Sequence, residues 1–306
     1  MVDGFINFNL NEKTPTIIKV IGVGGGGGNA VEYMYEKGIC DVDFVICNTD
    51  YQALRNSPIP CKIQLGKELT AGHGAGNNPA MGEKSAQESL ADIEAILKKD
   101  TRMAFITAAM GGGTGTGAAP VIAKLSKDMG ILTVGIVSVP ARFEGPKRLD
   151  QARDGLRRLK DHVDCLIVID NEKIKSIYGS QTISQAFAKA NDVLNIAAKG
   201  IAEIITLPGY INVDFADVRT VMTDSGVAIM GAAQASGEDR AIRAITEALE
   251  SPLLNNNDIL GAKDILLNIT SGTDEITMDE MSQITSHIIR KVGNNAAVIW
   301  GVGTDP

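Results

Sequence analysis

One glycine-rich stretch, residues 110–120, holds the groups best suited to chemistry and reads MGGGTGTGAAP. An expected strand, 105–109, precedes it, and an expected helix begins at 121–125. Glycines at such a junction leave several backbone N–H groups pointing at one spot near the positive end of the helix, which suits a phosphate. Thr114 and Thr116 add hydroxyls for a phosphate or a metal ion. A linker is the alternative, but linkers do not join a core strand to a helix with Pro120 near its start. The stretch therefore predicts a phosphate-binding turn.

A second glycine run, residues 22–29, follows an expected strand at 17–21 and precedes an expected helix. A further strand at 43–48 completes a strand–turn–helix–strand unit, whose two strands should be parallel. The run also fits the dinucleotide fingerprint, and Asp50 lies at a suitable distance for a ribose contact. Two interpretations therefore stay open: an NAD-dependent oxidoreductase, or two phosphate turns that hold one nucleoside triphosphate. Five consecutive glycines fit the fingerprint almost by accident, and the P-loop pattern GxxxxGK[ST] is absent from the sequence.

Two other segments have both a chemical and a structural interpretation. Residues 69–79 are small and polar, as in an ordinary surface loop. Arg142, Lys147 and Arg148 follow an expected buried strand at 131–139, where ligand contacts collect in parallel sheets. They are explained equally well as solvated loop charges.

A long helix is expected at 183–205, with an apolar stripe at steps of three and four residues and a length of about 35 Å. Taken alone, Phe187 reads as a core residue of this stripe and Asp192 as a surface charge. Asp214 and Asp217 open the next helix, and most Asp pairs with this spacing only cap a helix start. They follow the far end of the long helix, about 35 Å from its start.

The sequence GGGTGTG at 111–117 resembles the signature loop of the tubulin/FtsZ superfamily of polymerising GTPases. The similarity extends from residue 17 to the end of the chain and is greatest to bacterial cell-division proteins of the FtsZ family. The segment NVDFADVR at 212–219 also matches. The resemblance implies that the phosphates are held by Gly25, Gly26, Gly27, Gly28, Asn29, Ala75, Gly76, Gly111, Gly112, Gly113, Thr114, Gly115 and Thr116.

For the nucleoside, the resemblance implies contacts from Glu144, Arg148, Asn171, Phe187, Asn191 and Asp192. Phe187 would stack on the base, and Asp192 would accept from guanine N1–H and its amino group, a donor pair that adenine lacks. The residues Asn212, Asp214 and Asp217 would complete the active site of the neighbouring subunit. Valine at position 113 or 115 is then expected to abolish GTP binding without unfolding the chain.

The resemblance also implies cofactors, partners and a location. GTP or GDP would bind with Mg²⁺ held mainly through the nucleotide, without a protein metal site. The partners would be further copies of the chain, assembled head to tail, and division proteins that tether the filament to the membrane at mid-cell. Neither nucleic acid nor direct membrane insertion is expected. A nucleotide-binding regulator that does not polymerise is a further alternative.

The implied fold is α/β: a Rossmann-like parallel-sheet GTPase domain joined by a long central helix to a smaller α+β domain. The expected parts are a loose arm at 1–15, the GTP-binding domain at 16–182, the central helix at 183–207, and an α+β domain at 208–306 that ends before its last strand. Other expected elements are a helix at 85–98, a strand-like run at 226–235, a helix at 238–250, and a strand, helix and strand at 264–270, 279–291 and 296–301.

Composition sets broad limits on these interpretations. The 306 residues carry a formal net charge of −8, which argues against bulk attraction to nucleic acid or anionic membranes. No apolar run approaches the roughly 20 residues of a spanning helix. The four cysteines are scattered and read as reduced core residues. The three histidines have no metal-ligand spacing.

Overall fold

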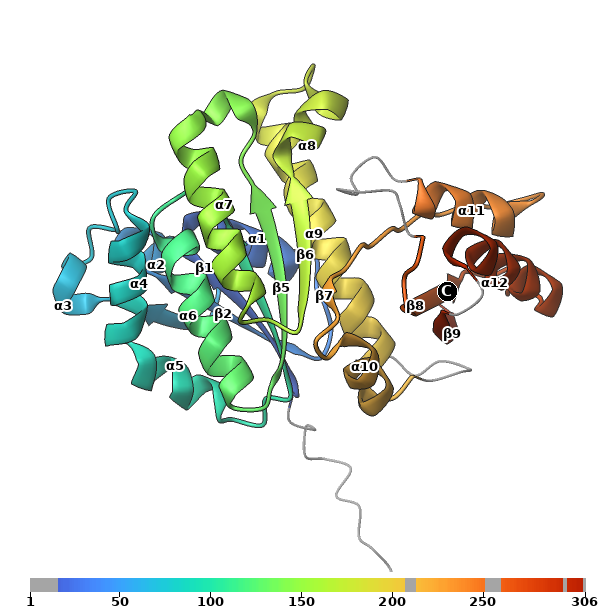
Figure 1. Cartoon of the computed structure of the whole chain (residues 1–306), viewed down its shortest axis with the longest axis horizontal. Helices are drawn as coiled ribbons and strands as arrows, with labels where there is room; N and C mark the ends of the chain where they lie inside the picture. The colour runs from blue at the N-terminus through green and yellow to red at the C-terminus, as the bar shows by residue number, and fades with distance from the viewer. Residues whose placement is uncertain (1–15, 207–212, 251–259, 294–295, 305–306) are drawn as a thin grey trace, which may run out of the picture.

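The computed structural model describes residues 16–206, 213–250, 260–293 and 296–304. Its main element is a seven-stranded parallel sheet in the order β3-β2-β1-β4-β5-β6-β7 (Figure 1). The strands of this sheet are β1 (Ile18–Val23), β2 (Val42–Asn48), β3 (Cys61–Gln64), β4 (Met103–Ala109), β5 (Leu132–Val139), β6 (Cys165–Asp170) and β7 (Gly226–Val227). The strand order reverses between β1 and β4, and the carboxyl ends beside such a reversal are where open α/β sheets bind ligands.

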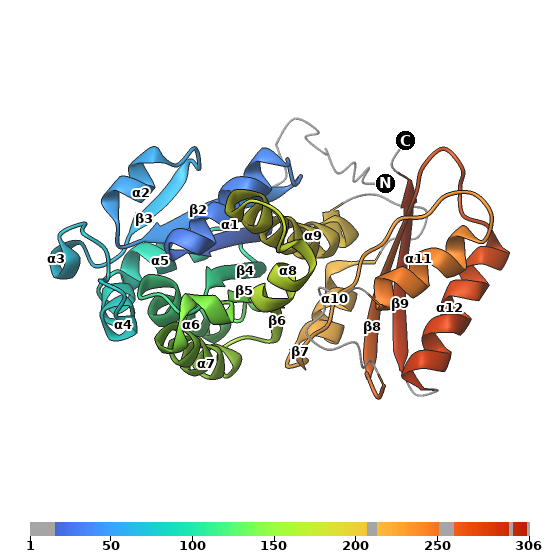
Figure 2. The same ribbon diagram turned by 90° about the horizontal axis from the view of Figure 1, so that it is seen from above.

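Helices cover both faces of this sheet, so most strand residues are buried on both sides, as parallel sheets require (Figure 2). One face carries α1 (Gly24–Glu36), α2 (Tyr51–Asn56), α9 (Ile183–Thr206) and α10 (Phe215–Met222). The other carries α4 (Pro79–Glu88), α5 (Leu90–Leu97), α6 (Thr114–Asp128) and α7 (Pro146–Lys160). The short helices α3 (Lys67–Thr70), η1 (Arg142–Glu144) and α8 (Asn171–Tyr178) lie in the connections.

The long helix predicted from its apolar stripe is present as α9, whose 24 residues give a length of about 36 Å. Thr182 and Gln185 bond to each other's backbone N–H and so cap its start. From Ala190 onward the stripe is buried on the sheet, but in the first turns Ile183 is 72% exposed and Phe187 45% exposed. The start of α9 therefore stands clear of the core, and the interpretation of Phe187 as a core residue is wrong.

A second, two-stranded parallel sheet pairs β8 (Asp264–Ser271) with β9 (Ala297–Thr304) and packs against α11 (Arg240–Leu249) and α12 (Met278–Val292). Arg240 holds the two helices together, because its guanidinium donates to both oxygens of Glu280 at 2.6 and 3.0 Å. This bidentate pair, together with bonds from Thr277, lowers the pKa of Glu280 to about 2.

The glycine-rich segments differ from the expected turns. α1 begins at Gly24, directly after β1, so Gly24–Gly28 are helical. Likewise α6 begins at Thr114, which leaves only residues 111–113 as a turn and places Pro120 inside the helix rather than at its first position. The first N–H groups of a helix have no partner within the helix. The glycines at the starts of α1 and α6 therefore still offer donors, although they are helical and not in a turn.

Two expected elements are wrong. The helix expected at 85–98 is two helices, α4 and α5, because the chain turns at Ser89, whose hydroxyl accepts from the N–H of Gly66. The strand-like run at 226–235 is a strand only at β7, which lies at the edge of the large sheet beside β6. Its two glycines and four alanines bring few side chains that favour a strand. The sequence interpretation also missed α2, β3 and α8.

Two glycines provide a test of the helix packing. A Cβ at Gly117 of α6 would overlap the carbonyl oxygen of Pro79 on α4, whereas a Cβ at Gly200 of α9 would meet nothing within 4 Å. We expect Gly117→Ala to lower the free energy of unfolding by about 1–3 kcal/mol. The matched change Gly200→Ala should raise it by about 0.4–1 kcal/mol, because alanine restricts the unfolded chain. Urea denaturation of both variants measures this, and equal effects would contradict the packing described.

Candidate functional site

Two helix starts without capping side chains meet at the carboxyl ends of β1 and β4. Neither α1 nor α6 has a side chain bonded to its first N–H groups. By contrast, α2 and α8, which follow β2 and β6, are capped by Asp50 and Asp170. The first N–H groups of α1 and α6 are therefore left to bind a ligand, and the positive ends of both helix dipoles favour an anion.

The glycines of these two starts fall into two groups. At Gly24, Gly113 and Gly115, a Cβ would come within 3.0 Å of backbone atoms, and at Gly26 and Gly27 it would overlap Ala109 and Thr107. These glycines are required by close packing of the protein itself. Valine at position 113 or 115 would therefore disturb the fold, contrary to the expectation from the sequence.

The second group opens onto free space. A Cβ at Gly25, Gly28 or Gly112 would meet nothing within 4 Å. Gly25 and Gly28 lie at the start of α1, and Gly112 lies in the turn before α6. Gly111, in the same turn, has φ +100 and lies against the backbone of Arg148.

The two threonines of the signature stretch differ in their surroundings. The Thr114 hydroxyl is half-buried and lies 2.7 Å from the hydroxyl of Thr49, which follows β2. The Thr116 hydroxyl is buried and accepts from the N–H of Gly111 at 2.8 Å, so it closes the turn from within. Thr114 is thus the threonine placed at the edge of the site.

The loop at 71–78 lies against the same turn. A Cβ on Gly113 would come 2.8 Å from the nitrogen of Asn78 and 3.0 Å from the Cβ of Ala75. Gln151 of α7 holds this loop by donating to the carbonyl of Asn77 at 3.1 Å. Ala75 is buried, while Gly76 is exposed with φ +58. The structure therefore brings Ala75 and Gly76 beside the 111–113 turn.

Glu144 and Arg148 form an ion pair of 2.8 Å after β5. Glu144 also accepts from the N–H of Ala141, and Arg148 remains half exposed. Next to them, Glu172 of α8 accepts from the N–H of Arg142 at 2.8 Å, and this bond and Lys175 lower the pKa of Glu172. These contacts tie the loop after β5 to α8.

Asn171 is the first residue of α8, and its buried Oδ1 has no partner within the described part of the chain. A buried acceptor without a partner is costly, so it marks a place for a donor from a ligand or water. On α9, Phe187 is exposed and Asn191 is half-buried. Asp192, one residue further, accepts a hydrogen bond from the Tyr33 hydroxyl at 3.1 Å.

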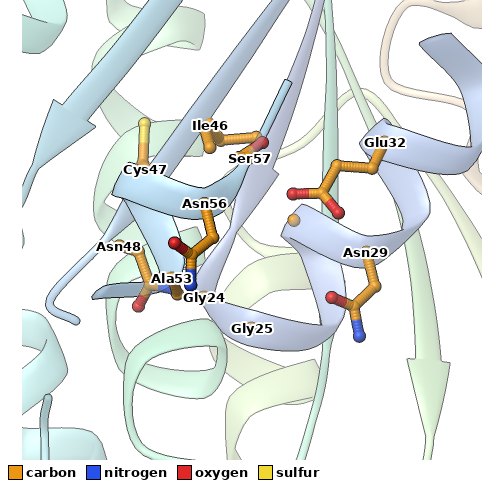
Figure 3. Close-up of a pocket in the computed structure, with 11 residues that line it drawn as sticks. Gly24, Gly25, Asn29, Glu32, Ile46, Cys47, Asn48, Ala53, Asn56 and Ser57 are labelled. Atoms are coloured by element: carbon orange, nitrogen blue, oxygen red, sulfur yellow. The ribbon is translucent and has the colours of Figure 1, made fainter. Parts of the chain in front are cut away.

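A pocket beside the start of α1 contains the predicted Asn29 together with Glu32, Asn48 and Asn56, which the sequence interpretation missed (Figure 3). Asn29 and Glu32 of α1 lie on one side of it, and Asn48 and Asn56 lie on the other. Gly25 and Gly28 also line it. Asn48 could have been found from its place at the carboxyl end of β2. Asp50 is used as the cap of α2, accepting from Gln52 and Ala53.

The structure does not bring Asp214 and Asp217 to this site. Both are exposed, and Asp214 accepts from the N–H of Asp217 at 2.8 Å, so it caps α10. Arg219 of α10 donates to the carbonyl of Gly130, which follows the end of α6 opposite to Thr114. The 15 residues of α6 span about 22 Å, so the carboxylates lie at the other edge of the sheet. Asn212 lies outside the described residues.

Within the described ranges, no three His, Cys, Asp or Glu side chains are arranged to hold a metal ion. No helix of this part of the chain is long and apolar enough to cross a membrane.

The protein has a seven-stranded parallel sheet, and two glycine-rich helix starts meet at the carboxyl ends of its strands. These features define a nucleotide-binding α/β protein. Comparison with protein families identifies which one: residues 17–179 match the tubulin/FtsZ family GTPase domain, and residues 226–306 match the FtsZ family C-terminal domain. The chain belongs to the FtsZ branch of this family and carries its GTPase domain. The NAD-dependent oxidoreductase alternative is therefore wrong.

Relatives agree with this assignment over the whole chain. The chain is 50% identical over 309 residues to the cell division protein FtsZ of Porphyromonas gingivalis, covering 100% of this chain and 67% of the relative. It is 48% identical to FtsZ of Coxiella burnetii, covering 98% and 78%. Among solved structures, the empty FtsZ dimer of M. jannaschii matches with a TM-score of 0.88 and 43% identity, covering 95% of this chain and 84% of that one.

The open space at Gly112 allows a sharper test of the phosphate turn than positions 113 and 115. Gly112→Val should fold normally, since its Cβ meets no protein atom within 4 Å. It should lower GTP affinity at least about tenfold by filling the space where the backbone would approach a phosphate. Titration with a fluorescent GTP analogue measures the affinity, and the melting temperature controls for folding. Unchanged affinity would show that phosphates do not contact this turn.

Proposed function

We propose that this protein hydrolyses GTP and assembles head to tail into filaments that act in cell division at mid-cell. Each active site would combine the nucleotide pocket of one subunit with Asp214 and Asp217 of the next. The observation that carries the proposal is the position of these carboxylates at the edge of the sheet opposite to the helix starts. One chain cannot bring both edges to one nucleotide, but two chains stacked head to tail can.

In this proposal the phosphates contact the starts of α1 and α6. Gly25, Gly28 and Gly112 provide the open approach, while Gly26 and Gly27 allow α1 to pack closely on β4 and Gly113 allows the 71–78 loop to approach the turn. Ala75 and Gly76 would cover the terminal phosphate from the third loop. Magnesium would enter with the triphosphate, since Mg²⁺ binds mainly through substrate phosphates and keeps several waters.

The nucleoside would lie between α1, α8 and the exposed start of α9. Phe187 has the exposure that stacking on a base requires. Asn171 has a buried acceptor that a guanine or ribose donor would satisfy, and Glu144 with Arg148 would fix the ribose and phosphates. Asp192 would accept from N1–H and the amino group of guanine. Asn29 on α1 and Asn191 on α9 would add hydrogen bonds to the nucleoside.

Hydrolysis in this proposal is positioning plus electrostatic stabilisation, as for phosphoryl transfer in general. Asp214 and Asp217 of the neighbouring subunit, with Asn212, would orient the attacking water and accept its proton. The FtsZ of M. jannaschii has been solved as a dimer. A head-to-tail contact that does not close gives an open filament.

The remaining parts of the proposal concern organisation and partners. Residues 16–182 would form the nucleotide domain, 183–207 the connecting helix and 208–306 the second domain, with 1–15 as an arm. Division proteins would tether the filament to the membrane, with no insertion of the chain itself and no binding of nucleic acid.

Guanine selectivity tests the role of Asp192. GTP should bind at least about tenfold more tightly than ATP, because adenine would leave the carboxylate without donors. Asp192→Ala should remove most of this difference while ATP affinity changes little. Competition against a fluorescent nucleotide measures both constants. Equal affinity of the unaltered protein for ATP and GTP would refute the proposed nucleoside site.

The shared active site is tested at Asp217 rather than Asp214. The Asp214 side chain caps α10 through the backbone N–H of residue 217, so Asp217→Asn leaves the cap in place. We expect Asp217→Asn to bind GTP normally and to lose GTPase activity by about a hundredfold or more. Gly112→Val has intact carboxylates but a defective pocket, so it should also be inactive alone.

An equimolar mixture of the two variants gives the decisive result. A Gly112→Val subunit docked on an Asp217→Asn subunit forms one complete site, so the mixture should regain activity that neither variant has. For the unaltered protein, activity per subunit should rise with concentration, as assembly completes the sites. Activity per subunit that stays constant down to monomeric concentrations would show that the carboxylates do not act between subunits. It would instead favour a GTP-binding protein that does not polymerise.

A further inference from the structure

One polar contact joins the two helices that flank the proposed base. The hydroxyl of Tyr33 on α1 donates to Oδ1 of Asp192 on α9 at 3.1 Å, although the residues are 159 positions apart in the chain. In the described part of the chain, no other donor bonds to this carboxylate, so Oδ2 is open. The bond therefore acts on the group to which the proposed function assigns guanine recognition.

The two helices that carry this contact are packed in one hydrophobic core. Ala30, Val31 and Met34 of α1 and Leu194 and Ala197 of α9 are buried in one core on the same face of the sheet. The Tyr33 ring is half-buried, and the ammonium of Lys37 lies 5.3 Å from its centroid. Burial and the bond to Asp192 raise the pKa of Tyr33, so near neutral pH its hydroxyl is protonated and can only serve Asp192 as a donor.

We propose that Tyr33 is a positioning residue for guanine recognition, whose hydroxyl holds Oδ1 of Asp192 so that both carboxylate oxygens face the base. This inference rests on the proposed function of Asp192. Guanine presents two parallel donors, and a bidentate contact requires the carboxylate in one plane with them. The terminal torsion of an aspartate is broad, so an unheld carboxylate would lose freedom on binding. An ionised carboxylate has about four acceptor sites, so Oδ1 can serve Tyr33 and the base together.

The test is Tyr33→Phe, which removes the hydroxyl and keeps the ring. We expect GTP affinity to fall about tenfold with ATP affinity unchanged, so the preference for GTP over ATP shrinks by the same factor. Inosine triphosphate keeps N1–H but lacks the amino group, and its affinity should fall less than that of GTP. A merely structural role of Tyr33 would weaken all three nucleotides equally.

Tyr35 provides the matched control on the same helix. Its ring packs edge-on against Phe44 at 5.5 Å, and its hydroxyl has no partner within the described ranges. Tyr35→Phe should leave the three affinities unchanged. In an Asp192→Ala background, Tyr33→Phe should have no further effect on GTP affinity, because its partner is gone.

The outcomes separate this inference from the proposed function. A protein that binds GTP and ATP equally refutes the nucleoside site itself. A protein that prefers GTP, and whose Tyr33→Phe variant keeps the same preference, refutes only the role of Tyr33. A higher GTP affinity in Tyr33→Phe would also refute it, by showing that the hydroxyl competes with the base. An equal loss for all nucleotides with a lower melting temperature would assign Tyr33 to packing alone.

Discussion

The close approach of α1 and α6 at the carboxyl ends of β1 and β4 is the constraint on which this molecule depends. A Cβ at Gly24 would come 2.8 Å from the nitrogen of Gly115, so the two helices can start side by side only with glycine there. The same condition holds where α4 crosses α6, at Gly82 and Gly117. That crossing carries the loop at 71–78 onto the turn at 111–113. The glycines thus allow two positive helix ends and a third loop to meet around one point, because a Cβ at these positions would collide with neighbouring atoms.

Because the strands are parallel, their carboxyl ends and their amino ends form two chemically different sides of the molecule. Both α6 and α9 span the distance between these two sides. At the edge opposite to the glycines, Lys127 near the end of α6 bonds to Asp224 after α10 at 2.7 Å and to Asp164 before β6 at 3.2 Å. Burial alone would lower the pKa of Lys127, but these hydrogen bonds outweigh burial and raise it. Asp164 also accepts from the N–H of Thr133. The position of α10, and with it that of Asp214, is therefore fixed relative to the strands that carry the nucleotide edge.

Periodic and glycine-rich patterns predicted the parallel strands, the long helix and a helix after each glycine run, because each depends on local sequence. Both of the latter helices begin within the glycines rather than after them. Which glycines are needed for packing and which face open space was not predictable. Only the fold shows that Gly113 packs against Asn78 while Gly112 faces open space. The same reason applies to Thr116. The sequence does not distinguish a threonine that faces a ligand, as was expected, from one whose hydroxyl is buried and accepts from the N–H of Gly111. The break at Ser89 and the early end of β7 depend on tertiary bonds and on edge pairing. The link between Tyr33 and Asp192 joins segments 159 residues apart and left no local signal.

Capping and catalysis are compatible roles for the carboxylates that open α10. The backbone N–H of Asp217 bonds to the Asp214 carboxylate and fixes that side chain, while both carboxylates remain exposed. In the proposed shared site, a carboxylate fixed in this way would lose little entropy when it meets a nucleotide on another molecule. In the proposed assembly, the two carboxylates and the glycine-rich helix starts lie at opposite ends of the strands. A contact between them would therefore be directional and could not be satisfied within a symmetric dimer, in which both subunits use the same patch. A polar filament is the assembly that satisfies both ends of every subunit except the two at its tips.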